Sequence, residues 1–144
     1  MKKINLKKSI LALAMTVATI SFATANNRTQ SFQTMDACVN SYVNLIKYGD
    51  VSSFNALFTE DAKFSISANG KVINHTKAEE LNFFKKNKGV TQQCEVQTAV
   101  MVNTDSYTIV KVSQIYDSFT RENFVTFVKS GKDWKINAVS SEFK

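Results

Sequence analysis

The chain has 144 residues, which suits one ordinary domain and is too short for two. Hydrophobic residues make up 44% and charged residues 21%, a globular composition that argues against an intrinsically disordered chain. Four glycines, no proline and two cysteines exclude a collagen-like chain and a disulfide-dense scaffold, and the formal net charge is +6.

The first 25 residues have the pattern of a cleaved export signal. Four lysines precede an apolar run from Ile10 to Ile20, and Ala23 and Ala25 supply the small residues of a signal peptidase site. The run is clearly shorter than the ~20 residues that a membrane-spanning helix needs. We therefore expect cleavage after Ala25, a periplasmic or secreted protein without a stable membrane anchor, a flexible leader over 26–33 and one domain over 34–144.

Removal of this signal changes the expected partners. Four lysines leave with it, which lowers the net charge from +6 to +2. The one local basic group that remains, Lys85, Lys86 and Lys88, is typical of a solvated helix end. A nucleic-acid partner needs a broader basic face with interleaved aromatic residues, so none is predicted.

The first half of the domain reads as helices. From Thr34 to Tyr48 the apolar residues recur at steps of three and four, which predicts a helix with Thr34 as its N-cap. Gly49 suits the left-handed position that ends a helix, and Asp50 suits the cap of a short second helix. The buried face of that second helix is expected to hold Phe54, Leu57 and Phe58.

A hairpin and a third helix follow. Residues 63–67 alternate as a strand, Asn69-Gly70 is a strong turn pair, and 71–74 is expected to return antiparallel. Thr76 and Glu79 have the spacing of a capping box, which predicts a helix from Thr76 to about residue 87. This helix is expected to bury Leu81, Phe84 and Ala78.

The second half of the domain reads as strands separated by brief polar breaks. Four segments are rich in Val, Ile, Thr, Phe and Tyr: 92–102, 106–117, 121–130 and 133–142. Short breaks favour antiparallel neighbours. Helices followed by a meander predict an α+β domain, with the helices on one face of a bent antiparallel sheet.

Two segments near the start and one near the end carry a resemblance to a known superfamily. Residues 42–50 (YVNLIKYGD) and 54–62 (FNALFTEDA) resemble the opening of nuclear transport factor 2-like proteins, and 129–136 (KSGKDWKI) is similar to their closing hairpin. The SnoaL-like, ketosteroid-isomerase-like and "putative lumazine-binding" groups belong to this superfamily, and the last is the most similar. The resemblance implies a cystatin-like cone, in which a curled antiparallel sheet and three helices enclose a pocket.

The resemblance also implies where chemistry would lie. In the ketosteroid isomerases a tyrosine of the first helix donates to the substrate oxyanion, and Tyr42 matches its place before the Gly-Asp break. A protonated acid in a late strand is the second donor, which points to Glu122. The general base is an aspartate five residues after the Asp of Asp-Ala, and this chain has Ile66 there. With that base missing, isomerase activity is not the favoured interpretation.

The remaining site residues have two interpretations each. His75, the single histidine, is a candidate base, or a solvated residue before the Thr76 cap. If the resemblance holds, Tyr42 and Glu122 share a pocket, and burial favours the neutral form of Glu122. The alternative is that Tyr42 is a core aromatic residue and that Glu122 pairs with a lysine. Five further residues either line the cavity or belong to the hydrophobic core: Ile66, Phe124, Thr126, Trp134 and Ile136.

Cys38 and Cys94 both have the spacing of inward-facing residues. In an oxidising compartment they form a disulfide or remain two buried thiols, and the sequence leaves both alternatives open. One histidine with scattered acids has no metal-ligand spacing, so neither a metal nor a cofactor is predicted.

Three hypotheses for function follow. The favoured one is an exported protein that binds a small apolar or aromatic molecule in the cone. The second is an isomerase- or dehydratase-type enzyme that uses Tyr42 and Glu122. The third is a homodimeric scaffold without chemistry, paired through a sheet face that carries Tyr116, Val125 and Phe127.

Overall fold

The computed structural model describes residues 30–144. The expected signal over 1–25 and the first part of the leader lie outside the described residues. Within 30–144, none of the helices has the length and apolar character needed to cross a bilayer.

Local capping sets the bounds of the first helix, α1 (Met35–Tyr48). The Thr34 hydroxyl accepts a hydrogen bond from the Ala37 amide at 3.2 Å, which satisfies one of the free amides of the first turn. Gly49 takes the left-handed conformation (φ 64°) and closes the other end. Both predictions for this helix are confirmed.

The second helix, α2 (Phe54–Leu57), is capped differently from the prediction. Its N-cap is Ser53, and Asp50 instead accepts hydrogen bonds from the amide and hydroxyl of Ser52 in a local turn. Phe54, Leu57 and the following Phe58 are fully buried, as expected.

The third helix, α3 (Lys77–Lys86), begins with the predicted capping box. The Thr76 hydroxyl accepts from the Glu79 amide, and the Glu79 carboxylate accepts from the Thr76 amide at 2.7 Å. Leu81 and Phe84 pack against the core, whereas Ala78 is exposed.

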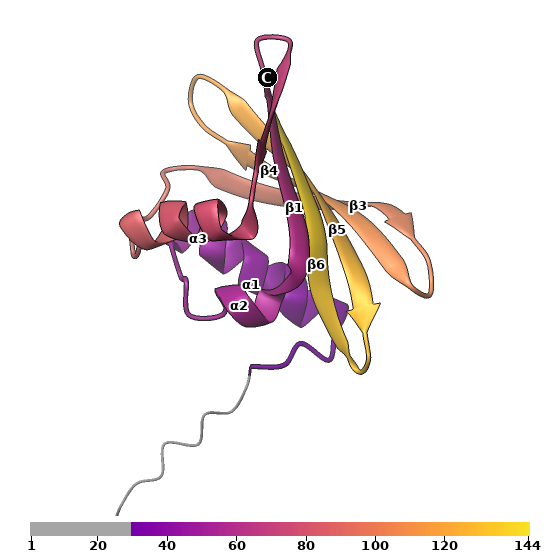
Figure 1. The fold of residues 1–144 in the computed structure, drawn as a ribbon. Helices are drawn as coiled ribbons and strands as arrows, with labels where there is room; N and C mark the ends of the chain where they lie inside the picture. Colours follow the sequence, from indigo (N-terminus) through magenta and orange to yellow (C-terminus); the bar gives the residue numbers. More distant parts are fainter. Residues whose placement is uncertain (1–29) are drawn as a thin grey trace, which may run out of the picture.

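Six strands form one sheet in the order β2-β1-β6-β5-β4-β3. Neighbours pair antiparallel, except that β1 and β6 run parallel, so the sheet is mixed rather than purely antiparallel. The helices gather on one side of the strongly twisted sheet (Figure 1). The strands are β1 (Phe58–Ala68), β2 (Lys71–His75), β3 (Glu95–Asn103), β4 (Tyr107–Ile115), β5 (Thr120–Ser130) and β6 (Asp133–Phe143).

The core lies between the helices and the concave face of the sheet. On β5, Val125 and Phe127 are fully buried in this core, and Asn123 lies on the same face. Because side chains alternate along a strand, Phe124 and Thr126 then point to the outer, convex face. The expectation that Val125 and Phe127 form an exposed dimer face is therefore wrong. Because apolar residues occupy both faces of the 121–130 strand, the sequence does not indicate which face is buried. In the structure, the face with Val125 and Phe127 packs against the helices.

Candidate functional site

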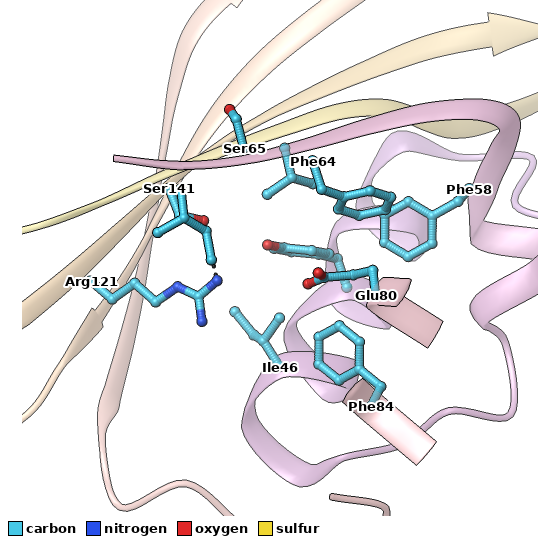
Figure 2. Close-up of a pocket in the computed structure, with 11 residues that line it drawn as sticks. Ile46, Phe58, Phe64, Ser65, Glu80, Phe84, Arg121 and Ser141 are labelled. Atoms are coloured by element: carbon cyan, nitrogen blue, oxygen red, sulfur yellow. Dashed lines mark hydrogen bonds between the residues drawn. The ribbon is translucent and has the colours of Figure 1, made fainter. Parts of the chain in front are cut away.

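The concave sheet and the helices enclose a small hollow, here called the inner hollow, with a volume of about 10 Å³. This is room for one water-sized group. Figure 2 shows the aromatic side chains of Phe58, Phe64 and Phe84 on one side and Arg121 on the other. The lining residues are Tyr42, Ile46, Phe58, Phe64, Ser65, Ile66, Glu80, Phe84, Arg121, Val139 and Ser141.

A second hollow, here called the outer hollow, adjoins the first beside α3 and has a volume of about 90 Å³. Ile46, Phe84 and Arg121 line both, so Arg121 lies at their junction. The outer hollow has an apolar side with the half-exposed Phe83 and a polar side with Gln92. Its other lining residues are Leu45, Gly49, Asn87, Val90, Gln114 and Tyr116.

Tyr42 lines the inner hollow from α1, as the resemblance implied. The residue is 3% exposed, and its ring contacts the edge of Phe58 with the centroids 6.5 Å apart. Burial raises the pKa of the Tyr42 phenol well above its usual range, so the hydroxyl keeps its proton at neutral pH. Among the hydrogen bonds of residues 30–144, none uses this hydroxyl, so a bound molecule can accept a hydrogen bond from it.

Arg121 projects into the same hollow from the start of β5. Its Nη2 donates to the Ser141 hydroxyl at 3.2 Å, and Ser141 donates in turn to the Asn123 side chain at 2.7 Å. The guanidinium also lies over the Phe143 ring, 5.8 Å from its centroid. Its Nε is the one buried side-chain nitrogen or oxygen within the described part of the chain that has no hydrogen-bond partner. An arginine is thus held in place with an unused donor.

Glu80 of α3 completes the polar lining. Figure 2 shows its carboxylate directed toward the Arg121 guanidinium across the hollow. Burial raises the pKa of the Glu80 carboxyl, while the positive charges of Arg121 and His75 act in the opposite direction. The hollow therefore combines one fixed cation with a carboxyl group that gains a proton more readily than usual.

Glu122 lies elsewhere than the resemblance implied. It faces the convex side of β5, where its carboxylate pairs with Lys144 at 2.7 Å and with Lys111 at 3.5 Å. The hydrogen bond from Lys144 is the main reason why the Glu122 pKa is lowered. A lowered pKa favours the charged carboxylate, whereas the resemblance implied a protonated Glu122 that donates a hydrogen bond. The structure corrects the expectation that Glu122 and Tyr42 share a pocket, because residue 122 has the outward parity of its strand.

The other predicted pocket residues divide between three environments. Ile66 lines the inner hollow, at the position where the isomerases carry their base. Phe124 and Thr126 lie on the convex face, and Ile136 is fully buried in the core. Trp134 packs against that core beside Phe32, whose carbonyl accepts from the Trp134 amide at 2.7 Å. These last four residues do not line either hollow.

His75 and the two cysteines lie apart from the hollows. His75 ends β2, is half-buried and precedes the Thr76 cap. Cys38 and Cys94 are both free thiols. Cys38 is buried against the Trp134 carbonyl, and burial raises the pKa of its thiol to about 12. Cys94 lies at the other end of the sheet, within 4.0 Å of the Gln114 amide nitrogen.

Three residues of the inner hollow were not singled out from the sequence: Glu80, Arg121 and Ser141. A sequence signal exists for Glu80, because its spacing of four from Phe84 places both residues on one face of a helix. Arg121 also left a signal, because the chain has only two arginines among its eighteen basic residues. No sequence signal marks Ser141. Within residues 30–144, histidine, cysteine and acidic side chains do not gather in threes as a metal site.

A profile of the family described as "Putative lumazine-binding" matches residues 30–141. The chain belongs to this family. The putative lumazine-binding family is part of the nuclear transport factor 2-like superfamily, and the helices and curled sheet described above agree with that assignment. A search of the curated proteins found no match.

Solved structures share the fold of this lumazine-binding family member at low sequence identity. A nuclear transport factor 2-like protein of unknown function from Silicibacter pomeroyi has a TM-score of 0.61 at 14% identity, over 76% of this chain and 92% of its own. A cystatin-like fold protein from Burkholderia xenovorans has a TM-score of 0.59 at 19% identity, over 75% and 87%. A nuclear transport factor 2-like protein from Cytophaga hutchinsonii has a TM-score of 0.57 at 18% identity, over 73% and 91%. These likenesses concern the fold.

Proposed function

We propose that this protein binds a small, partly apolar molecule in the cone, in contact with the Tyr42 hydroxyl. The observation that carries this proposal is the pair of adjoining hollows, in which the hydroxyl of Tyr42 makes no hydrogen bond to the described residues. A preformed, mainly apolar hollow with a few converging polar groups is the usual form of a small-ligand site. Membership in the family described as "Putative lumazine-binding" supports the same proposal.

The volumes set how a ligand would be placed. The inner hollow has room for one polar group beside Tyr42, and the larger outer hollow has room for an apolar body against α3. Phe83 is 53% exposed at the wall of the outer hollow, where its movement would widen the entrance. The ligand is therefore expected to be small, with one polar end and one flat or aliphatic end.

We also propose that the protein acts outside the cytoplasm. The support is the pattern of residues 1–25, a basic start, a short apolar run and small residues at 23 and 25. N-terminal sequencing of the protein from an expressing cell would test this. A mature chain that starts at Asn26 is the expected result, and retention of Met1 in a cytoplasmic fraction would contradict it.

Native mass spectrometry of the protein, purified under non-denaturing conditions, tests the binding proposal. The wild type is expected to carry a small molecule as an added mass that disappears on denaturation. Ile66→Trp places a large ring into the inner hollow and should abolish the added mass. Thr126→Trp makes a similar increase in bulk on the convex face and should retain it.

Tyr42→Phe is a milder variant that removes only one oxygen atom. It should fold normally and show reduced occupancy, because the ligand loses a hydrogen bond of about 0.5–1.5 kcal/mol. Circular dichroism checks the fold of each variant. An added mass that persists at wild-type occupancy in both Ile66→Trp and Tyr42→Phe would show that the ligand binds elsewhere and would overturn the proposal.

A further inference from the structure

We propose that the molecule bound in the cone is a small carboxylic acid, whose carboxylate pairs with the Arg121 guanidinium. This inference rests on the proposed function and names the chemical class of its ligand. Its starting point is the Arg121 guanidinium, which lines both hollows and forms no salt bridge within the described residues, and whose buried Nε has no hydrogen-bond partner. A buried donor on a charged group is costly when nothing accepts from it.

The surroundings of Arg121 show that this donor is positioned rather than simply left over. Ser141 accepts from Nη2 at 3.2 Å, and Phe143 lies against the guanidinium plane. Ser141 is itself 4% exposed and donates to the fully buried Asn123. Because both contacts fix the guanidinium, the directions of its remaining N–H donors are fixed as well.

The fit favours a carboxylate over other anions. A planar carboxylate matches the planar donors of a guanidinium, and such pairs are shorter and stronger than neutral hydrogen bonds. The small volume of the inner hollow, about 10 Å³, favours the smaller of the two anions, because a carboxylate has two oxygen atoms and a phosphate has four. The Glu80 carboxyl across the hollow would also repel a doubly charged group more strongly than a singly charged one.

Tyr42 and the outer hollow supply the rest of the site. The neutral Tyr42 hydroxyl is a second donor at the wall of the inner hollow. The apolar body of the acid would lie in the outer hollow, beside Leu45 and Phe84. The site thus separates a charged end from an apolar end, as a small aromatic or aliphatic acid requires.

Binding of an acid would be linked to protonation of Glu80. Three groups from neighbouring elements act on Glu80: Arg121 of β5, His75 of β2 and Tyr42 of α1. A bound anion neutralises Arg121 and adds a negative charge, so it favours the protonated form of Glu80. A proton is therefore taken up on binding, and affinity should fall as the pH rises through the Glu80 pKa.

The test is an NMR titration of the ¹⁵N-labelled exported protein that observes the Arg121 Nε–H signal directly. The probes are acetate, benzoate and nicotinate, each paired with its primary amide, together with inorganic phosphate. At least one carboxylate should shift this signal to saturation and bind about 10-fold more tightly than its amide, because the amide lacks the charge. Phosphate should not saturate. Arg121→Lys keeps the positive charge, removes Nε–H and should weaken carboxylate binding about 10-fold.

The pH dependence supplies a second measurement that does not require Arg121 to be changed. As the pH rises above the ordinary glutamate value of 4.5, wild-type affinity for the carboxylate should fall, and Glu80→Gln should remove most of that fall. His75→Gln should retain it. Retention of the fall in Glu80→Gln, with its loss in His75→Gln, would overturn the proton linkage.

The outcomes separate this inference from the proposed function. If an amide binds within about 3-fold of its acid and is blocked by Ile66→Trp, the cone binds small molecules and the carboxylate inference is wrong. If no carboxylate saturates the Arg121 signal below about 50 mM, the inference is also wrong. If the probes bind equally well to Ile66→Trp, both the inference and the proposed function fail.

Discussion

Ser141 holds the Arg121 guanidinium in the hollow through a hydrogen bond of 3.2 Å. The same hydroxyl donates to Asn123, whose amide donates to the Val112 carbonyl at 3.1 Å. One small side chain near the end of β6 thus connects the edge of the hollow to the middle of the sheet. This relay makes the position of Arg121 depend on residue 141.

Ser141→Ala should therefore destabilise the protein by about 1–3 kcal/mol, because Asn123 and Arg121 each lose a partner in a buried place. Urea unfolding measures the change. Ser140→Ala is the matched control, since Ser140 is exposed on the convex face and shares only a hydroxyl contact of 3.0 Å with Ser65. Equal losses in the two variants would show that the relay adds nothing.

Gly49→Ala should destabilise the protein more than the same change at Gly131. Both glycines have positive φ, at 64° and 65°, so each substitution costs about 1–2 kcal/mol of backbone strain. A Cβ at residue 49 would also lie 2.7 Å from both the Asn87 carbonyl oxygen and the Gly89 nitrogen, whereas residue 131 has open space. Thermal unfolding should show the larger loss for Gly49→Ala. Similar losses would contradict the close approach of the chain at Gly49.

The two cysteines should differ in reactivity. Cys38 is fully buried and its thiol pKa is raised to about 12, so it should resist alkylation in the folded protein at about pH 8. Cys94 is half-buried and should be modified first. Mass spectrometry after iodoacetamide treatment measures both sites. If neither cysteine reacts after denaturation without a reducing agent, the two are joined in a disulfide, and this result would contradict the free thiols of the structure.

Acid should weaken the pairing of Glu122 with Lys144. The Glu122 pKa is lowered in the folded protein, so its contribution to stability is present above the ordinary glutamate value of 4.5 and is lost as the pH falls through the lower folded value. Urea midpoints between about pH 6 and about pH 3 should therefore fall further in the wild type than in Glu122→Gln. Parallel profiles would exclude this ion pair as the cause.

A homodimer stays a prediction, and we expect the two copies to associate through the convex face of the sheet. Val102, Ile109, Thr126 and Ala138 lie opposite one another across β3, β4, β5 and β6, and all are half-buried. Thr126→Arg would place a charge in the middle of this row and should convert a dimer to a monomer in analytical ultracentrifugation. Lys132→Glu, in an exposed turn, should leave the association unchanged. A wild type that sediments as a monomer would remove the prediction.

The local structure of the domain follows from short stretches of the sequence. The Thr34 cap, the Thr76–Glu79 box, the Asn69-Gly70 turn and the four late strands all lie within two or three residues of their predicted places. Each depends on hydrogen bonds or side-chain alternation within a few residues, so the information is contained in a short segment. Tyr42 and Ile66 also line the hollow, as the resemblance implied.

The set of residues that meet in the hollow depends on how the strands and helices pack together. Arg121, Glu80 and Ser141 come from β5, α3 and β6, and nothing local relates their positions. On β5 the apolar residues occupy both faces, so pairing with β4 and β6 had to fix which face turns inward. Because this face turns inward, Val125 and Phe127 are buried and Arg121 lies in the cone. Glu122 has the opposite parity and pairs with lysines on the convex face.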